Sequence, residues 1–135
     1  MLLKDYFPNL NKKYYDLSFK GIAFNSKKVK EGYIFFAFKG NNTDGNLFIN
    51  EAIKNGSKII ITDKLKTNIR KNNILFLKEK NPRNLLAKFS SKIFSKKPKN
   101  LIAVTGTNGK SSIANFYFQI LTLNGIKAAS IGTLG

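Results

Sequence analysis

Short apolar runs, separated by polar and glycine-containing stretches, set the pattern of this 135-residue chain. The run at 33–38 is continuously apolar and aromatic, which predicts a buried strand. Runs at 58–62 and 74–77 predict two further strands, and 17–24 predicts a strand with a bulge near its glycine. The stretch 63–73 between two of these runs is polar, so it is expected to be a connection.

Helical periodicity appears between the apolar runs. Residues 46–55 have apolar side chains at helical spacing, and the following Gly56 is a typical residue just past a helix end. A second helix is predicted to begin at 81–82, where asparagine is the N-cap and proline the first helical residue. The apolar face of that helix comprises Leu85, Leu86, Phe89 and Ile93. A short helix is expected over 2–7 and is expected to stop at Pro8. The alternation of strand and helix predicts an α/β fold.

The stretch 101–112 combines an apolar run, a glycine loop, a Lys-Ser pair and a helical pattern. This order is the context of a phosphate-binding P-loop. Gly106 and Gly109 allow backbone N–H groups to converge, and the helix N-terminus adds a partial positive charge. Lys110 is expected to reach the β- and γ-phosphates of ATP, and Ser111 to ligate Mg²⁺. The helix after the loop has an apolar face of Ile113, Phe116, Tyr117, Ile120 and Leu121, of which Tyr117 is expected in the core.

The P-loop prediction rests on context, because the general pattern has a glycine where Val104 occurs here. An ordinary strand-to-helix turn would explain the two glycines, but it does not require Lys and then Ser at the first helical positions. Two strands are expected next to this helix in the sequence, one before it at 101–104 and one after it at 127–131.

A polar segment at 95–100, which contains the last proline, is predicted to be a linker. It would divide the chain into an N-terminal α/β domain at 1–98 and the beginning of a nucleotide-binding domain at 99–135. None of the seven carboxylates follows Glu79, although a P-loop enzyme normally uses an acidic residue on a later strand to hold Mg²⁺. We therefore expect the chain to be the front of a longer protein and not to turn over ATP alone.

Composition narrows the classes of function. The chain lacks cysteine and histidine, so it has no disulfide, no thiolate nucleophile and no histidine base. Its formal net charge is +17, but the lysines are spread along the whole sequence, so polyanionic small molecules are expected as ligands and specific nucleic-acid binding is not. No signal peptide or membrane-length apolar run occurs, and a cytoplasmic location is expected.

At Val104-Thr-Gly-Thr-Asn-Gly-Lys-Ser-Ser112 the chain resembles the Mur ligases, the ATP-dependent amino-acid-adding enzymes of peptidoglycan synthesis. Within that family it is most similar to the MurE type. The ending Ser130-Ile-Gly-Thr-Leu-Gly135 is similar to the MurE pattern Gly-Thr-x-Gly, and the stretch 25–56 is similar to the uridine-nucleotide domain pattern. The resemblance implies a three-domain protein, of which this chain covers the UDP-binding domain and the first β–P-loop–α–β unit of the central domain.

The resemblance also assigns site residues and a reaction. Contacts to the UDP part of the substrate are implied for Phe24, Ser26, Asn41, Asn42 and Thr43. The ATP phosphate loop is implied for Gly106, Thr107, Asn108, Gly109, Lys110, Ser111 and Ser112, with Lys110 catalytic and Ser111 on Mg²⁺. The implied reaction adds the third amino acid to UDP-N-acetylmuramoyl-L-alanyl-D-glutamate through an acyl phosphate. The sequence leaves meso-diaminopimelate and L-lysine open as that amino acid, and meso-diaminopimelate is the one expected. A monomer without membrane insertion is expected.

The same residues also allow simpler structural interpretations, and the chain allows other functions. Ser26 and 41–43 are residue types favoured in turns, and Phe24 is a residue type favoured in cores. The family's Asp-Ser-Arg reads Asn25-Ser26-Lys27 here, which removes a charge pairing. Alternative functions are another ligase of the same superfamily, of the MurF type or a folylpolyglutamate synthetase, and a basic module that binds anions or nucleic acid.

Overall fold

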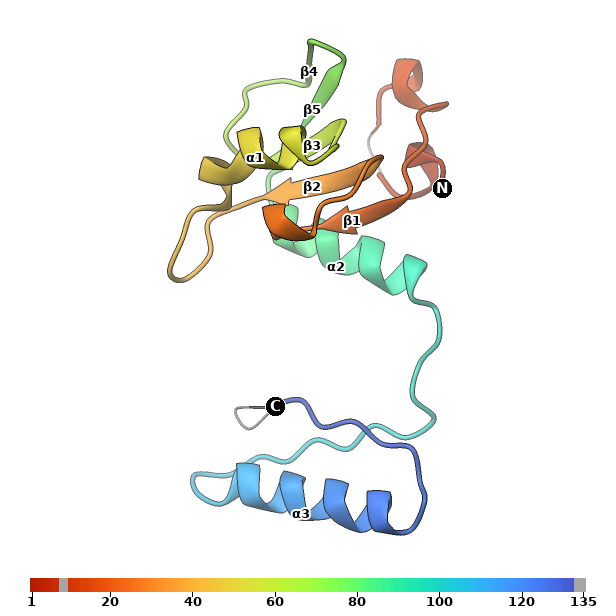
Figure 1. Cartoon of the computed structure of the whole chain (residues 1–135), viewed down its shortest axis with the longest axis vertical. Coiled ribbons are helices and arrows are strands. Elements are labelled where there is room, and N and C mark those ends of the chain that lie inside the picture. The colour runs from red at the N-terminus through yellow and green to blue at the C-terminus, as the bar shows by residue number, and fades with distance from the viewer. Residues whose placement is uncertain (8–9, 133–135) are drawn as a thin grey trace. The chain divides into compact units, whose positions relative to one another are not determined.

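A five-stranded sheet organises the first of two units into which the chain divides, Met1–Lys96 and Lys97–Gly135. The computed structural model describes residues 1–7 and 10–132, so the expected stop at Pro8 lies outside the described residues. The strands are β1 (Gly21–Ala23), β2 (Tyr33–Ala37), β3 (Ile59–Thr62), β4 (Ile69–Lys71) and β5 (Ile74–Lys78). Their order is β1-β2-β3-β5-β4, in which β4 alone runs antiparallel to its neighbour and the other pairs are parallel (Figure 1).

Helices cover both faces of this sheet, as an α/β fold requires. The α-helices are α1 (Ile49–Lys54), α2 (Pro82–Ile93) and, in the second unit, α3 (Lys110–Leu123). The 3-10 helices are η1 (Leu3–Asp5), η2 (Lys12–Tyr14), η3 (Ser26–Lys28) and η4 (Gly45–Phe48). Figure 1 shows α1 and α2 on opposite sides of the strands. The α/β prediction is therefore confirmed for the first unit.

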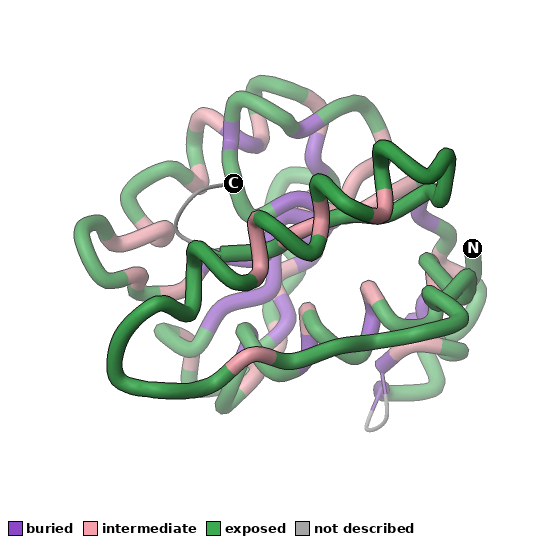
Figure 2. The backbone as a smooth tube through the Cα atoms, turned by 90° about the horizontal axis from the view of Figure 1, so that it is seen from below, coloured by how far each residue is buried: buried purple, intermediate pink, exposed green. Residues whose placement is uncertain are grey.

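The central strand β2 supplies side chains to two separate cores, because successive residues of a strand point to opposite faces. Ile34 and Phe36 lie in one apolar cluster with Leu85 and Phe89 of α2. Phe35 lies in the other cluster, which includes Ala52 of α1. The buried residues are purple in Figure 2 and include most of β2 and all of β3. The continuous apolar pattern of 33–38 is thus explained by burial on both faces.

Capping residues fix the helix ends that the sequence predicts. The Asn81 side chain accepts a hydrogen bond from the Asn84 N–H at 3.1 Å, and Pro82 occupies the first turn of α2. At the end of α1, Gly56 adopts a φ of +102°, which disfavours any residue with a Cβ. The Ser57 N–H then donates to the Ala52 carbonyl at 3.0 Å, which closes the turn in a Schellman arrangement.

Three expectations for the first unit need correction. The segment 63–73 contains the strand β4, which the sequence hides because all three of its residues are exposed at the sheet edge. The strand expected over 17–24 is limited to β1, because Gly21 begins the pairing there with Tyr33 of β2. The helix expected over 2–7 is only the 3-10 turn η1, followed by buried Phe7.

The second unit contains α3, but among its described residues neither 101–104 nor 127–131 is a strand. A strand exists only when a neighbour accepts and donates its backbone hydrogen bonds, and no partner strand is paired with either segment. The apolar face expected on α3 is present, yet no described residue of this helix is buried, including Tyr117. The prediction that Tyr117 lies in the core is therefore wrong for this structure.

Candidate functional site

The carboxyl ends of four parallel strands meet at one edge of the sheet in the first unit, which is where ligands bind in open α/β folds. Phe24 to Ser26 follow β1 there, the loop 38–44 follows β2, and Lys64 follows β3. The N-terminus of α2 follows β5. The topology thus places two of the sequence-predicted UDP segments, 24–26 and 41–43, at one edge.

The loop after β2 is a closed turn with its tip in solvent. The Gly40 N–H donates to the Thr43 carbonyl at 2.8 Å, and Lys39 pairs with Asp44 in an isolated antiparallel bridge. Asn41 and Asn42 lie between these contacts and are exposed, as is Thr43. Figure 1 shows this loop projecting away from the sheet after β2. Its side-chain amides and hydroxyl are therefore available to an external ligand.

A hydrogen-bonded network beneath this loop connects the ends of β2 and β3. The Asp44 carboxylate accepts from the Asn46 N–H at 2.9 Å and from the Asn46 side-chain amide at 2.8 Å. The Thr62 hydroxyl, buried at the end of β3, donates to the Asn46 side-chain oxygen at 2.6 Å. Sequence reasoning did not select these three residues, although an aspartate directly before a helical turn is a capping signal. The network fixes the base of the loop that carries Asn41 to Thr43.

Asp44 is the carboxyl group whose acidity this arrangement changes. Hydrogen bonds from the backbone and side chain of Asn46 are the main causes that lower the pKa of Asp44 below its ordinary 3.8, and the charges of Lys64 and Lys39 act in the same direction. Because the folded-state pKa is the lower one, the stabilising contribution is fully present above the unfolded-state value and is lost as pH falls through the folded-state value.

We therefore expect Asp44→Asn to lower the melting temperature of the chain at neutral pH, and the difference from the unmodified chain to shrink below about pH 4. Asp63→Asn, at an exposed carboxylate after β3, is the matched control. Thermal melts followed by circular dichroism between pH 3 and 7 measure both variants. A difference for Asp44→Asn that stays the same across this range would contradict a stabilising contribution from the Asp44 charge.

Basic side chains lie beside the same loop. Arg83, in the first turn of α2, places its guanidinium 5.1 Å from the ring centre of Phe38 and donates to the Lys39 carbonyl at 3.5 Å. The guanidinium thus holds the start of the loop by a cation–π contact as well as a long hydrogen bond. Together with Lys39 and Lys64, it gives this part of the edge three cationic groups. Such a surface attracts a polyphosphate.

The segment after β1 presents one exposed and one buried residue. Phe24 is 65% exposed, so it is not the core residue that its type favours. Ser26 is 5% exposed, and its hydroxyl donates to Glu51 of α1 at 2.9 Å. The Asn25 side chain accepts from the Lys27 N–H at 3.0 Å, which caps η3. An exposed ring beside a fixed serine is a surface on which a planar ligand group could pack.

In the second unit, the predicted phosphate loop leads directly into α3. Gly109 is the residue before the helix and has a φ of +74°, which disfavours a side chain. The Lys110 ammonium folds back over the loop and donates to the carbonyl of Gly106 and, at 2.9 Å, to that of Thr107. The N-terminus of a fourteen-residue helix lies at this point, and its positive dipole end favours an anion there. Gly106 to Gly109 thus form the loop and Lys110 to Ser112 begin α3, with the Lys110 ammonium directed onto the loop.

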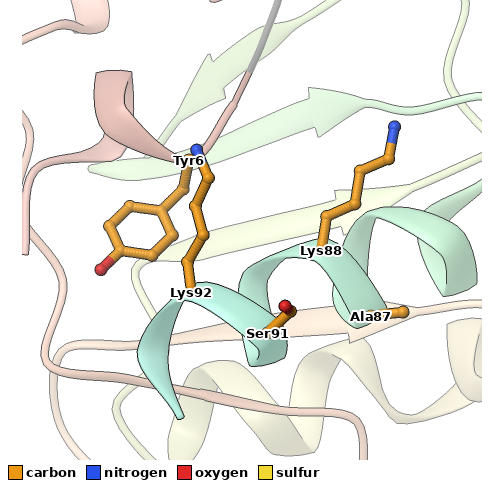
Figure 3. A pocket seen from close by; sticks show the side chains of 5 residues that line it. All are labelled: Tyr6, Ala87, Lys88, Ser91 and Lys92. Atoms are coloured by element: carbon orange, nitrogen blue, oxygen red, sulfur yellow. The ribbon is translucent and has the colours of Figure 1, made fainter. Parts of the chain in front are cut away.

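The described part of the chain contains no cluster of three metal-ligating side chains. A hollow on the first unit is lined by Tyr6, Ala87, Lys88, Ser91 and Lys92 (Figure 3). The Lys92 ammonium is already bonded to the Asp5 carbonyl at 2.6 Å, and these α2 residues lie more than one turn beyond the N-terminus that faces the carboxyl edge. Among the described residues, no helix is long and apolar enough to cross a membrane.

Comparison with known proteins decides the family. Residues 18–96 match the model described as "Mur ligase family, catalytic domain". The chain belongs to the Mur ligase family. This match spans the sheet of the first unit and its carboxyl edge, and it confirms the resemblance that the sequence motifs indicate.

Named relatives of this Mur ligase chain are considerably longer than it is. A protein of Rickettsia montanensis named UDP-N-acetylmuramoyl-L-alanyl-D-glutamate--2,6-diaminopimelate ligase is 46% identical over 127 residues, which are 94% of this chain and 26% of that protein. A protein of the same name from Zymomonas mobilis is 38% identical over 126 residues, 93% of this chain and 25% of that protein. The chain therefore spans about a quarter of the length of these relatives.

Solved structures of Mur ligases share the fold. The MurF ligase of Thermotoga maritima in complex with ADP has a TM-score of 0.58 and 28% identity, over 77% of this chain and 23% of that one. A structure of a UDP-N-acetylmuramoyl-L-alanyl-D-glutamate--2,6-diaminopimelate ligase has a TM-score of 0.69 and 23% identity, over 100% of this chain and 28% of that one. The second likeness concerns the fold alone.

Proposed function

We propose that this chain is the N-terminal part of an ATP-dependent ligase that adds diaminopimelate, in its meso form, to UDP-N-acetylmuramoyl-L-alanyl-D-glutamate. The observation that carries the proposal is the 46% identity, over nearly the whole chain, to a relative named for that reaction. The relatives' names favour the MurE type over the MurF type and over a folylpolyglutamate synthetase. They also favour diaminopimelate over L-lysine.

We assign a different binding role to each of the two parts of the chain. Residues 1–98 would be the UDP-sugar domain, and residues 99–135 would begin the ATP domain. In the first domain, Phe24, Ser26 and the loop 41–43 would contact the UDP part of the substrate. These contacts would lie far from the reacting carboxylate, so they would supply remote binding energy that holds the substrate for the chemical step.

In the second domain, the loop from Gly106 to Ser112 would cradle the ATP phosphates. An ADP complex of a related MurF ligase supports a nucleotide as the ligand. Lys110 would exchange the carbonyls of Gly106 and Thr107 for phosphate oxygens and balance the charge that develops during transfer. Ser111 would hold Mg²⁺ through its hydroxyl, and the ion would supply positive charge next to the phosphates. The acidic ligand that such a site needs is not available after Glu79 and would come from outside these 135 residues.

The reaction proposed for the complete ligase has two steps. The terminal carboxylate of the dipeptide attacks the γ-phosphorus of ATP and gives an acyl phosphate and ADP. The amine of the incoming amino acid then attacks the acyl carbon, an amide bond forms, and inorganic phosphate leaves. The residues of this chain would position and stabilise the first step, and the chain alone would be inactive. A cytoplasmic monomer is part of the same proposal.

Substrate binding by the first unit tests the proposal most directly. We expect UDP-N-acetylmuramoyl-L-alanyl-D-glutamate to raise the melting temperature of the chain, because a ligand at 100 times its Kd adds about 2.7 kcal/mol to the free energy of unfolding. UDP-glucose is the control for the muramoyl-peptide part, and double-stranded DNA at moderate salt is the control for charge alone. Stabilisation by DNA and none by the muramoyl compound would reject the ligase in favour of a basic binding module.

A further inference from the structure

Helix α1 holds Ser26 by two side chains one turn apart. The Ser26 hydroxyl donates to Oε2 of Glu51 at 2.9 Å. The side-chain amide of Asn55 donates to the Ser26 carbonyl at 3.0 Å. These partners are 25 and 29 positions away in the sequence, so they tie α1 to the segment after β1. The side chain and the backbone of Ser26 are thus both fixed by a different element of the fold.

The bond to Glu51 determines what else the Ser26 hydroxyl can do. A serine hydroxyl has one hydrogen and two lone pairs, whereas an ionised carboxylate can only accept. The hydrogen is therefore committed to Glu51, and toward any further group the Ser26 oxygen can only accept. A phosphate oxygen is itself an acceptor, so it is an unsuitable partner for this hydroxyl.

The charge nearest to the Ser26 hydroxyl acts in the same sense as this restriction. The Glu51 carboxylate next to Ser26 would repel a diphosphate at short range. Lys27 and Lys28 follow Ser26 in η3, whereas Lys39, Lys64 and Arg83 belong to the loops after β2 and β3 and to α2. The bond to Glu51 thus favours a hydrogen-bond donor of the nucleoside over a phosphate oxygen as the group that would meet the Ser26 hydroxyl.

We propose that Glu51 is a positioning residue of the uridine-nucleotide site, which fixes Ser26 as the acceptor for a donor of the uridine. The uridine has three such donors, the N3–H of the base and the two ribose hydroxyls. The inference rests on the proposed function, in which Ser26 contacts the UDP part of the substrate.

The experiment measures UDP affinity of the 135-residue chain by calorimetry for five variants. We expect Ser26→Ala and Glu51→Ala each to weaken UDP binding about five- to tenfold, the range of one hydrogen bond, and the double variant to lose little more. Glu51→Gln keeps an acceptor oxygen and is expected to stay within about twofold of the unmodified chain. Glu31→Ala, at an exposed carboxylate, is the matched control and is expected to bind UDP unchanged.

Analogues separate a positioning role from a structural one. N3-methyl-UDP, 2′-deoxy-UDP and 3′-deoxy-UDP each lack one of the three donors. The analogue that lacks the donor to Ser26 is expected to bind the unmodified chain and Glu51→Ala equally. The other two analogues are expected to bind Glu51→Ala more weakly than the unmodified chain. Equal losses for all three analogues would mean that Glu51 only supports the fold and would overturn the inference.

The remaining outcomes are also decisive. If the unmodified chain binds UDP and neither Ser26→Ala nor Glu51→Ala weakens it, the inference fails and the proposed function stands. If the unmodified chain binds neither UDP nor the muramoyl compound, the proposed function fails and the inference with it. Should Glu51→Ala not fold, Ser26→Ala with the three analogues still identifies or excludes a uridine donor at this hydroxyl.

Discussion

Replacing Lys110 with alanine in the complete ligase that we propose is expected to weaken ATP binding by more than a hundredfold. The Lys110 ammonium lies on the loop against two carbonyl oxygens, where it would face the phosphates of a bound nucleotide. Each hydrogen bond to a charged group contributes about 1.5–3 kcal/mol, so the loss of two such bonds removes about 3 kcal/mol or more. Equilibrium binding of ATP in the presence of Mg²⁺ measures the effect.

Lys127→Ala provides the comparison for this variant. Lys127 is an exposed lysine of the same unit, so its removal changes the net charge by the same amount without touching the loop. We expect its ATP affinity to stay near that of the unmodified ligase. Equal affinities for Lys110→Ala and the unmodified enzyme would reject the phosphate-loop assignment.

Replacing Phe89 with alanine is expected to lower the free energy of unfolding of the first unit by about 3–5 kcal/mol. Phe89 is fully buried on α2, with ring centres of Tyr6, Phe19 and Phe36 at 5.2, 5.8 and 5.4 Å. Its removal would leave a cavity where α2, the N-terminal segment and the central strand meet. Because whole domains are stable by only about 5–15 kcal/mol, the variant would be close to unfolding.

Phe94→Ala is the control for the loss of an aromatic ring, because Phe94 follows the same helix and is 69% exposed. Urea unfolding followed by circular dichroism is expected to show a small change for Phe94→Ala and a large decrease in midpoint for Phe89→Ala. Similar midpoints for the two variants would contradict the central position of Phe89 in the core.

The layers of the first unit were predictable because apolar periodicity and capping residues report burial and helix ends directly. The run at 33–38 and the pair 81–82 carried that information within a few adjacent residues. The edge strand β4 carried none, since an exposed strand is defined by its partner and not by its own side chains. The strands expected at 101–104 and 127–131 were wrong for the same reason, because apolar composition cannot supply a neighbouring strand.

The candidate site was predictable where a local motif carries the chemistry and hidden where distant residues do. The apolar run, glycine loop and Lys-Ser pair at 101–112 together predict a phosphate loop from adjacent residues. Two sets of hydrogen bonds join residues that only folding brings together. One connects Asp44, Asn46 and Thr62, and the other connects Ser26 and Glu51. Their residue types are ordinary turn and helix residues, so no spacing in the sequence separates them from many similar ones. Which of them contact ligand remains a prediction.

The parallel order of β1, β2, β3 and β5 has a consequence for how this architecture diversifies. Every segment that follows one of these strands emerges at a single rim, and the returning connections leave from the opposite one. Insertions and substitutions in these segments can therefore change which ligand is bound, while the packing of the two apolar clusters stays the same. Loops transplanted between relatives at this rim should transfer preference for a nucleotide without the need to redesign the interior.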